Sequence, residues 1–245
     1  MSYPDHLDIE LTTRCNLSCT FCPFHSNGQT EPLDMPFSLY TKLIDEIEGK
    51  VSSVKLNYRG EPLLYNELTS AIAYAKDAGL RVMINSNGIL LDERTVLALQ
   101  EAGLDLFLLS DYGHDIQLDN GLLLSLTDIE LKVKTDSPEH WEGITDEPVP
   151  FTLFDYGDLK EDFTKSSFKC SIPFERLLVL ADGTISKCSC GYWHPIKKLG
   201  NFPSMSIRGA WNHVEMKFLR TCHEHGDSHL LRMCRMCAVR RGHDE

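Results

Sequence analysis

Three cysteines stand close together near the N-terminus, in the stretch TRCNLSCTFCPF (residues 13–24). Cys15, Cys19 and Cys22 are spaced four and three residues apart, with no fourth cysteine within reach. A zinc finger would need a second ligand pair nearby, and a disulfide would leave one thiol over. Three thiolates in one loop suit one face of an iron–sulfur cube, whose fourth iron stays open for another ligand.

Composition limits the classes of protein to consider. A chain of 245 residues, 42% of them apolar, suits one large globular domain or one domain with an appendage. A net charge of −12 argues against non-specific binding to nucleic acid. The apolar runs are too short to span a membrane, and the N-terminus does not have the pattern of a signal peptide. Nine cysteines in such a chain therefore favour metal ligation in the cytoplasm.

The elements that must position the cysteine loop alternate along the first half of the chain. Strands are predicted over 7–13, 53–58, 80–86, 104–110 and 129–134, and helices over 37–49, 65–79 and 92–103. This alternation predicts an α/β fold with a parallel sheet, a partial (β/α) barrel of about five to six units. Ligands of such sheets bind at the carboxyl ends of the strands, where the cysteine loop follows the first strand.

The alternation is lost beyond about residue 135, where turn-forming residues predict a connection. We expect a domain over 1–155 and a small cysteine-rich domain over 156–245. Residues 176–188 predict a β-hairpin with a type I′ turn at Asp182-Gly183. Residues 206–222 predict a helix with one apolar stripe, made of Ile207, Trp211, Val214, Phe218 and Leu219.

The motif CNLSCTFC has the C-x3-C-x-aromatic-C form of the radical S-adenosylmethionine (SAM) enzymes, with Phe21 at the aromatic position. Similar family motifs follow in order, YRGEPLL after the second strand and NSNG after the third. YRGEPLL resembles the Gly-Gly-Glu motif that holds the methionine amino group, with Arg59 in place of the first glycine. The resemblance implies that the three thiolates hold a 4Fe–4S cluster and that seven residues line the SAM site: Phe21, Gly60, Glu61, Pro62, Asn85, Asn87 and Ser110.

The residue types suit these roles. The Glu61 carboxylate can accept hydrogen bonds from an ammonium, and Gly60 lets the backbone approach a ligand closely. Taken alone, Glu61 could be a solvated loop carboxylate, and Asn85 and Asn87 could merely serve a turn. The ordered set favours the SAM site over these readings.

The C-terminal cysteines resemble the SPASM or twitch module, which carries auxiliary 4Fe–4S clusters. Cys170 is followed by twelve residues, Gly183, four residues and Cys188. The resemblance implies one auxiliary cluster, held by Cys170, Cys188, Cys234 and Cys237. In size and cysteine spacing the chain is similar to short radical SAM dehydrogenases of aminocyclitols. This resemblance implies SAM and two 4Fe–4S clusters as cofactors. It also implies an electron donor such as flavodoxin or ferredoxin.

A zinc site is the alternative for the tail. Cys222, His223, His225 and His229 cluster near Cys234 and Cys237. We expect Cys190 and Cys222, which the cluster assignment leaves over, to be small buried residues.

Together these features predict a radical SAM oxidoreductase that abstracts a hydrogen atom from a small polar substrate, such as a sugar, cyclitol or nucleotide-linked sugar. A two-electron dehydrogenation would use the auxiliary cluster as electron acceptor. A peptide or protein modifier and a non-catalytic, metal-stapled binding module are the alternatives. The sequence does not select a catalytic base among Arg59, Asp111 and the loop residues.

Overall fold

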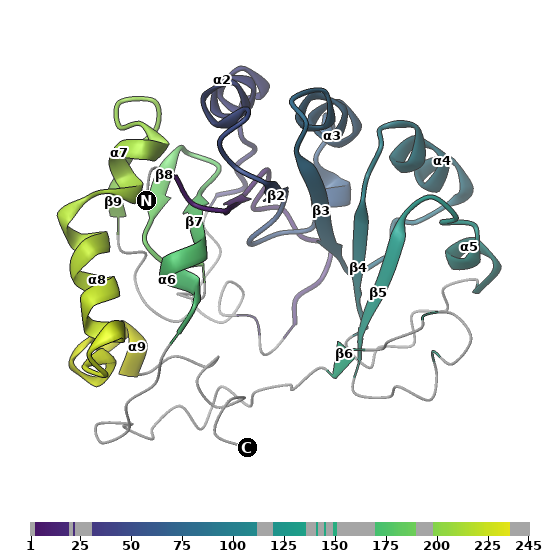
Figure 1. The fold of residues 1–245 in the computed structure, drawn as a ribbon. Coiled ribbons are helices and arrows are strands. Elements are labelled where there is room, and N and C mark those ends of the chain that lie inside the picture. The colour runs from purple at the N-terminus through teal and green to yellow at the C-terminus, as the bar shows by residue number, and fades with distance from the viewer. Residues whose placement is uncertain are drawn as a thin grey trace.

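The computed structural model describes residues 3–19, 22, 31–111, 120–135, 141, 145, 149–150, 170–189 and 198–235. Over these residues nine strands form one open sheet, in the order β6-β5-β4-β3-β2-β1-β7-β8-β9 (Figure 1). The strands are β1 (His6–Ile9), β2 (Ser53–Lys55), β3 (Arg81–Ser86), β4 (Leu106–Ser110), β5 (Glu130–Thr135), β6 (Val149–Pro150), β7 (Arg176–Val179), β8 (Thr184–Ser186) and β9 (Lys198–Asn201). The predicted α/β class and open sheet are confirmed.

Strands β6 to β1 and β7 pair in parallel, so that their carboxyl ends meet at one edge of the sheet. The connecting helices are α2 (Phe37–Ile47), α3 (Leu68–Asp77), α4 (Glu93–Glu101) and α5 (Asn120–Leu124), and the 3₁₀ turn η1 (Pro62–Leu64) follows β2. Each of the five strands and three helices predicted in this half is present. Most are shorter than predicted, β1 begins one residue earlier, and β5 is shifted by one residue. The short helix α5 was not predicted.

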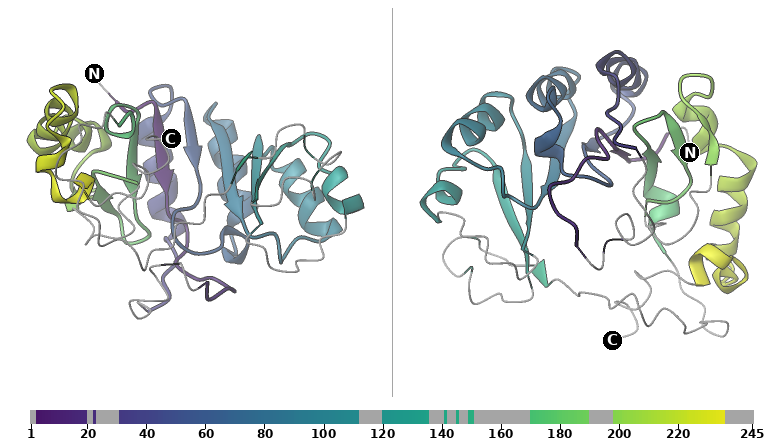
Figure 2. Two further views of the ribbon diagram at one scale, coloured as in Figure 1. Left: turned by 90° about the horizontal axis from the view of Figure 1, so that it is seen from below. Right: turned by 180° about the vertical axis from the view of Figure 1, so that it is seen from behind.

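Helices α2, α3 and α4 lie side by side along one face of the sheet (Figures 1 and 2). Apolar spacing explains how α2 packs, since Tyr40, Leu43, Ile44 and Ile47 are all buried on one side of this helix. The Tyr40 hydroxyl donates a hydrogen bond to the carbonyl oxygen of Ala71 in α3, at 2.7 Å. The helices thus leave the carboxyl edge of the sheet to the loops that follow the strands.

The C-terminal part extends the same sheet. Strand β7 pairs in parallel with β1, with Leu177 opposite Leu7, and β8 and β9 continue as antiparallel strands. The remaining helices, α6 (Ile172–Glu175), α7 (Ile207–Trp211), α8 (Val214–Glu224), η4 (Ser228–Leu230) and α9 (Arg232–Arg235), belong to this part. Figure 1 shows α7, α8 and α9 beside the β7–β9 end of the sheet.

The predicted hairpin over 176–188 is present, but its turn differs from the type I′ prediction. Only Gly183 has a positive φ (81°), whereas type I′ requires positive φ at Asp182 as well. The amide N–H of Gly183 donates to the Leu180 carbonyl oxygen, and that of Leu180 donates to Thr184. This is a three-residue loop that ends in a left-handed glycine, and the Asp182 carboxylate stabilises it by accepting from Thr184 N at 2.8 Å.

The single apolar stripe predicted over 206–222 is wrong in part. Ile207, Trp211 and Leu219 are buried, but Val214 and Phe218 are 70% and 60% exposed. The reason is a break between two helices, because the His213 side chain caps a new helix by accepting from Glu215 N. The new helix therefore buries a different set of residues: Met216, Leu219, Arg220, Cys222 and His223.

None of the helices in the described part of the chain has both the length and the apolar character that a membrane span requires.

Candidate active site

The two ends of the cysteine loop are fastened together at the carboxyl end of β1. Thr13 N donates to Leu33 O at 2.9 Å, and Met35 N donates to Leu11 O at 2.8 Å. Thr12 forms an isolated antiparallel bridge with Asp34. These backbone contacts fix where the loop leaves the sheet and where it returns.

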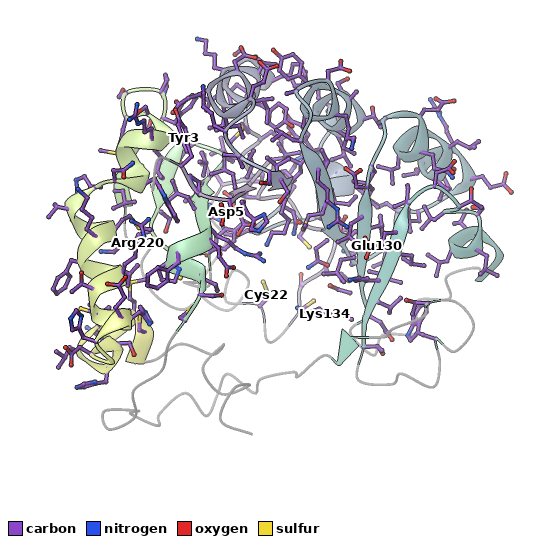
Figure 3. All side chains as sticks on the ribbon, in the orientation of Figure 1. Tyr3, Asp5, Cys22, Glu130, Lys134 and Arg220 are labelled. Carbon is purple, nitrogen blue, oxygen red and sulfur yellow. The ribbon has the colours of Figure 1, made fainter. Side chains whose placement is uncertain are left out.

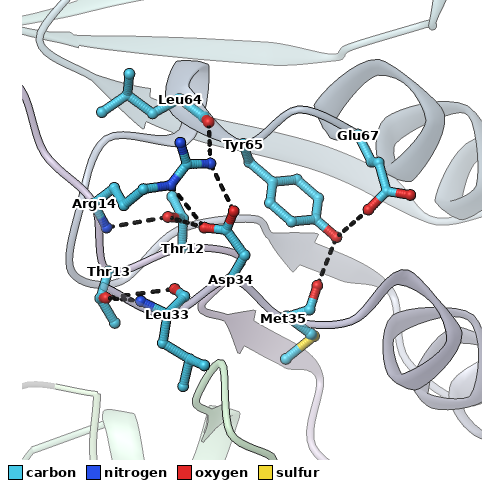
Figure 4. Close-up of polar contacts among 9 residues, drawn as sticks. All are labelled: Thr12, Thr13, Arg14, Leu33, Asp34, Met35, Leu64, Tyr65 and Glu67. Atoms are coloured by element: carbon cyan, nitrogen blue, oxygen red, sulfur yellow. Dashed lines mark hydrogen bonds and ion pairs between the residues drawn. The ribbon is translucent and has the colours of Figure 1, made fainter. Parts of the chain in front are cut away.

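An ion pair reinforces this closure (Figure 4). Arg14 donates from Nε to Oδ1 of Asp34 at 3.0 Å and from Nη2 to Oδ2 at 2.6 Å. The same Nη2 donates to the carbonyl oxygen of Leu64 in η1, at 2.5 Å. Arg14 therefore ties the start of the cysteine loop both to its return segment and to the turn that follows Glu61.

The three N-terminal cysteines lie close enough together for their charges to interact. Burial, together with the charges of nearby Cys15 and Cys22, raises the pKa of the Cys19 thiol to about 11. Burial likewise raises the pKa of Cys15, with additional contributions from the charges of Glu61 and Cys22. Figure 3 shows Cys22 at the level of Lys134, the penultimate residue of β5, at the carboxyl edge of the sheet. Three neighbouring thiols in one loop suit a cluster, whose positive irons would stabilise them as thiolates.

Gly60 holds the SAM-motif turn against the cysteine loop. It has a φ of 70°, and a β-carbon built on it would lie 2.5 Å from Thr12 O and 2.7 Å from Arg14 O. Directly after it, Glu61 N donates to Arg14 O at 2.7 Å. The approach is possible only for glycine, so the motif residue serves loop-to-loop packing.

The Glu61 side chain is 2% exposed, and three neutral donors hold its carboxylate. Oε1 accepts from Ser86 Oγ at 2.7 Å and from Leu63 N at 3.0 Å, and Oε2 accepts from Asn87 N at 2.8 Å. Burial raises the pKa of Glu61, although these hydrogen bonds oppose the rise. In the described part of the chain no cationic side chain pairs with it. A carboxylate has about four acceptor sites, so one remains for an ammonium group.

The polar residues at the ends of β3 and β4 are bonded to one another. Asn85 Oδ1 accepts from Ser110 Oγ at 2.7 Å, which links the two strand ends. Asn87 Nδ2 donates to Oδ1 of Asn16 at 2.8 Å, which links β3 to the cysteine loop. Pro62 is buried and begins η1. The structure thus gathers Gly60, Glu61, Asn85, Asn87 and Ser110 around the cysteine loop, and their contacts with SAM remain a prediction.

Arg59, which stands where the family motif has its first glycine, forms a buried ion pair that was not predicted. Its guanidinium donates from Nε to Oε1 of Glu10 and from Nη2 to Oε2 at 2.7 Å. Glu10 is fully buried and also accepts from Ala181 N at 3.1 Å. Burial lowers the pKa of Arg59, but the hydrogen bond and charge of Glu10 outweigh this, and the pKa is raised. Arg59 therefore stays charged and cannot act as a base.

Asp111, the other base candidate, directly follows β4. Its Oδ2 accepts from Thr135 Oγ1 at 2.8 Å and from Trp141 Nε1 at 2.9 Å. These bonds hold the carboxylate at the carboxyl edge of the sheet, beside the end of β5.

In the C-terminal part, a buried histidine lies between two of the predicted cluster ligands. His223 Nδ1 accepts from Cys170 N at 3.2 Å, and His223 Nε2 lies 3.4 Å from Cys234 Sγ. Cys188 follows the end of β8 and is half-buried. From the sequence, His223 was considered only as a possible zinc ligand. Its contacts with Cys170 and Cys234 could not be predicted, because these residues lie 53 and 11 positions away.

Phe21, Cys190 and Cys237 lie outside the described residues, and so do most of the loops beyond β4 and β5. Across the ranges that are described, no three His, Cys, Asp or Glu side chains are grouped closely enough to hold a single metal ion. Cys222 is buried, as expected for a structural cysteine.

Comparison with known proteins identifies the class. Residues 9–111 match the radical SAM superfamily, and residues 170–238 match the SPASM iron–sulfur cluster-binding domain. The chain thus combines a radical SAM superfamily region with a C-terminal SPASM region, and this combination implies SAM and iron–sulfur clusters as its cofactors.

Among its relatives is the S-adenosyl-L-methionine-dependent 2-deoxy-scyllo-inosamine dehydrogenase of Niallia circulans, which is 20% identical over 94% of this chain and 91% of that protein. The cofactor-modifying protein of the tungsten-containing aldehyde ferredoxin oxidoreductase of Pyrococcus furiosus is 34% identical, but over 41% of this chain. Three relatives, including this one, are 34% to 40% identical to the chain, which spans only 33%, 29% and 24% of their lengths.

The fold is similar to that of BtrN, crystallised in complex with AdoMet and 2-DOIA. The two structures agree with a TM-score of 0.73 over 96% of this chain and 92% of BtrN, at 19% sequence identity. The predicted likeness to the aminocyclitol dehydrogenases is confirmed at the level of family and fold.

Proposed function

We propose that this chain removes a hydrogen atom from a small polar substrate, such as a sugar, cyclitol or nucleotide-linked sugar, and completes a two-electron dehydrogenation. The observation that carries the proposal is the alignment with the dehydrogenase of Niallia circulans along 94% of the chain. The relatives of higher identity match less than half of it. The dehydrogenase therefore shares the C-terminal half as well as the radical SAM half.

The residues divide between two cofactor sites. Cys15, Cys19 and Cys22 would hold one cluster, and Glu61 would accept a hydrogen bond from the ammonium group of SAM beside it. The second cluster would be held by Cys170, Cys188, Cys234 and Cys237. When bound, SAM and the two clusters would supply a radical able to abstract hydrogen and an acceptor for the second electron.

The protein's own part is to place the substrate and remove a proton. Loss of a hydrogen atom beside a hydroxyl group leaves a carbon radical, and the hydroxyl proton must then leave as the carbonyl forms. Arg59 is held as a charged partner of Glu10, so it can orient a polar group but cannot accept the proton. Asp111 is a carboxylate fixed by Thr135 and Trp141 at the substrate edge of the sheet, which makes it the base candidate.

The polar character of the strand ends supports a polar substrate. Hydrogen-bonding side chains end three neighbouring strands, with Asn57 after β2, Asn85 in β3 and Ser110 in β4. Asn57 Oδ1 accepts from Asn85 N and Asn85 Oδ1 accepts from Ser110 Oγ, so these groups form one polar network at the site. A polar surface of this kind suits hydroxyl and amino substituents better than apolar ones.

The deciding experiment compares the amount of 5′-deoxyadenosine with the amount of oxidised product. Anaerobic, reconstituted enzyme would be assayed against a panel of aminocyclitols, sugars and nucleotide-linked sugars, with 2-deoxy-scyllo-inosamine as the first compound. The proposal expects one 5′-deoxyadenosine and one carbonyl product per SAM consumed. An epimerised product, SAM regenerated at each turnover, or activity only on a peptide would reject the dehydrogenation while leaving the radical SAM class in place.

We also propose that a flavodoxin or ferredoxin supplies the reducing electron and that the enzyme works in the cytoplasm. An iron–sulfur site ligated by free thiolates requires reducing surroundings, which supports this location. SAM cleavage with purified flavodoxin and its reductase in place of dithionite would test the donor.

A further inference from the structure

His223 is one of the most buried polar residues of the C-terminal part, with 2% of its surface exposed. It projects from α8, whose buried face contacts the segment that begins at Cys170 on one side and the turn η4 before Cys234 on the other. Its two ring nitrogens reach one group on each side: Nδ1 reaches the backbone N–H of Cys170, and Nε2 reaches the sulfur of Cys234.

The contact with Cys170 determines which nitrogen carries the proton. A backbone N–H can only donate, so Nδ1 must accept with its lone pair. In a neutral imidazole the hydrogen then sits on Nε2, which faces Cys234 Sγ at 3.4 Å. A histidine that binds a metal through Nε2 normally donates its Nδ1–H to a neighbour, which is the opposite arrangement. The geometry of His223 is that of a hydrogen-bond donor to the Cys234 sulfur, and it argues against His223 as a zinc ligand.

The neighbouring turn of α8 keeps His223 in place. Arg220, three residues earlier on the same buried face, donates from Nε to the carbonyl oxygen of Pro173 at 2.8 Å. Its guanidinium stacks over the Trp211 ring at 3.9 Å. Two side chains of α8 therefore anchor the 170–173 segment, so the ring of His223 is held between its two partners.

We propose that His223 is a positioning residue that donates an Nε2–H···S hydrogen bond to Cys234 and thereby raises the reduction potential of the auxiliary cluster. This inference rests on the proposed function, because it needs Cys170 and Cys234 to be cluster ligands. Hydrogen bonds to cluster sulfurs stabilise the reduced, more negative state. A higher potential makes the cluster a better acceptor for the second electron of the dehydrogenation.

Two substitutions separate the two contacts of the ring. His223→Gln places a side-chain amide where Nε2 lies and keeps a donor for Cys234. His223→Asn reaches only the Nδ1 position, so it keeps an acceptor for Cys170 N and loses the donor to sulfur. His225→Asn is the control, because His225 is the exposed C-cap residue of the same helix.

The measurement is the midpoint potential of the auxiliary cluster, followed by electron paramagnetic resonance in a redox titration. All variants are made in a chain that also carries Cys15→Ala, Cys19→Ala and Cys22→Ala, so that only the auxiliary cluster contributes a signal. We expect His223→Asn to shift the potential to more negative values, His223→Gln to shift it less, and the control to leave it unchanged. Equal potentials for all four proteins would overturn the inference.

Metal analysis of the same samples distinguishes failure of this inference from failure of the proposed function. If the parent chain with three substitutions holds about four irons and sulfides, the auxiliary cluster is present and the potentials decide the role of His223. If it holds zinc instead, the proposed second cluster is wrong, and the donor role falls with it. If His223→Asn loses its iron while His223→Gln retains it, the donor role is supported, because His223→Asn keeps the acceptor for Cys170 N and lacks the donor to sulfur.

Discussion

The backbone of Gly60 lies so close to Thr12 that a β-carbon on Gly60 would stand 2.5 Å from the Thr12 carbonyl oxygen. This contact joins two motifs that are 48 positions apart, the cysteine loop after β1 and the turn that carries Glu61 after β2. The hydrogen bond from Glu61 N to Arg14 O extends it. The spacing between the cysteine loop and the Glu61 carboxylate is therefore set by backbone packing between neighbouring loops.

Replacing Gly60 with alanine tests this packing, and Gly79→Ala is its matched control. Both glycines have positive φ, of 70° and 74°, but a β-carbon on Gly79 would meet nothing within 4 Å. Gly79→Ala should cost about 1–2 kcal/mol of unfolding free energy for the backbone conformation alone. Gly60→Ala should cost roughly 1–3 kcal/mol more, because the backbone must shift. We expect SAM cleavage to fall sharply only in Gly60→Ala, and equal cleavage in both variants would contradict the packing argument.

Glu61→Gln should weaken SAM binding by ~1.5–3 kcal/mol, the value of a charge-assisted hydrogen bond, as measured by anaerobic calorimetry. The reason is that glutamine keeps the shape of Glu61 but has no negative charge for the ammonium group. Unchanged affinity would remove Glu61 from the SAM site.

Ser86→Ala is the control for the placement of this carboxylate. It deletes the 2.7 Å bond from Ser86 Oγ to Glu61 Oε1 and leaves the charge intact. We expect a smaller loss of SAM affinity than in Glu61→Gln. A larger loss would mean that the hydrogen-bond network, and not the charge, governs binding.

The N-terminal cysteines should be required for any cleavage of SAM. A chain in which Cys15, Cys19 and Cys22 are all alanine should form no 5′-deoxyadenosine under reducing conditions. Cys222→Ala should retain cleavage, because Cys222 is a buried packing residue of α8. The iron content of the unmodified protein should be about eight per chain, and about four with one zinc would instead support the zinc alternative for the tail.

Sequence patterns predicted the elements well, because apolar periodicity and glycine stops are local signals. The strand that delivers the cysteine loop, the helix 37–49 and the hairpin near Gly183 all follow from residues within one window. The predicted apolar stripe containing Val214 and Phe218 was wrong because the N-cap at His213 starts a second helix. A single capping residue can interrupt an apolar periodicity that otherwise predicts one continuous helix.

Long-range polar partners could not be predicted in the same way. Glu10 reads as one polar residue in an alternating strand, yet its partners Arg59 and Ala181 are 49 and 171 positions away. The available signal was Arg59 itself, a charge where the family motif has glycine, since a guanidinium at a crowded strand end needs a carboxylate. His223 gave no such signal, because it is only one of several histidines near the C-terminus, where His225, His229 and His243 follow it.

The Glu10–Arg59 ion pair supports the last prediction, which concerns how the two halves of the chain are joined. Glu10 lies at the end of β1 and is fully buried, Arg59 belongs to the loop before η1, and Ala181 in the hairpin loop donates to the same carboxylate. Arg59→Met keeps the length of the side chain but leaves a buried carboxylate without its cation. Breaking a buried pair in this way costs about 3–5 kcal/mol, so the midpoint of urea unfolding should fall strongly.

Arg81→Met is the matched control, because the pair between Arg81 and Glu130 is 51% and 43% exposed and should contribute only about 0–1 kcal/mol. Arg59→Met should also reduce the iron content of both halves, since Glu10 holds the cysteine strand and the hairpin before Cys188 together. If Arg59→Met and Arg81→Met unfold at the same urea concentration, the buried pair does not stabilise the join between the halves. If Arg59→Met unfolds earlier but binds iron normally, the pair stabilises the fold without positioning the clusters.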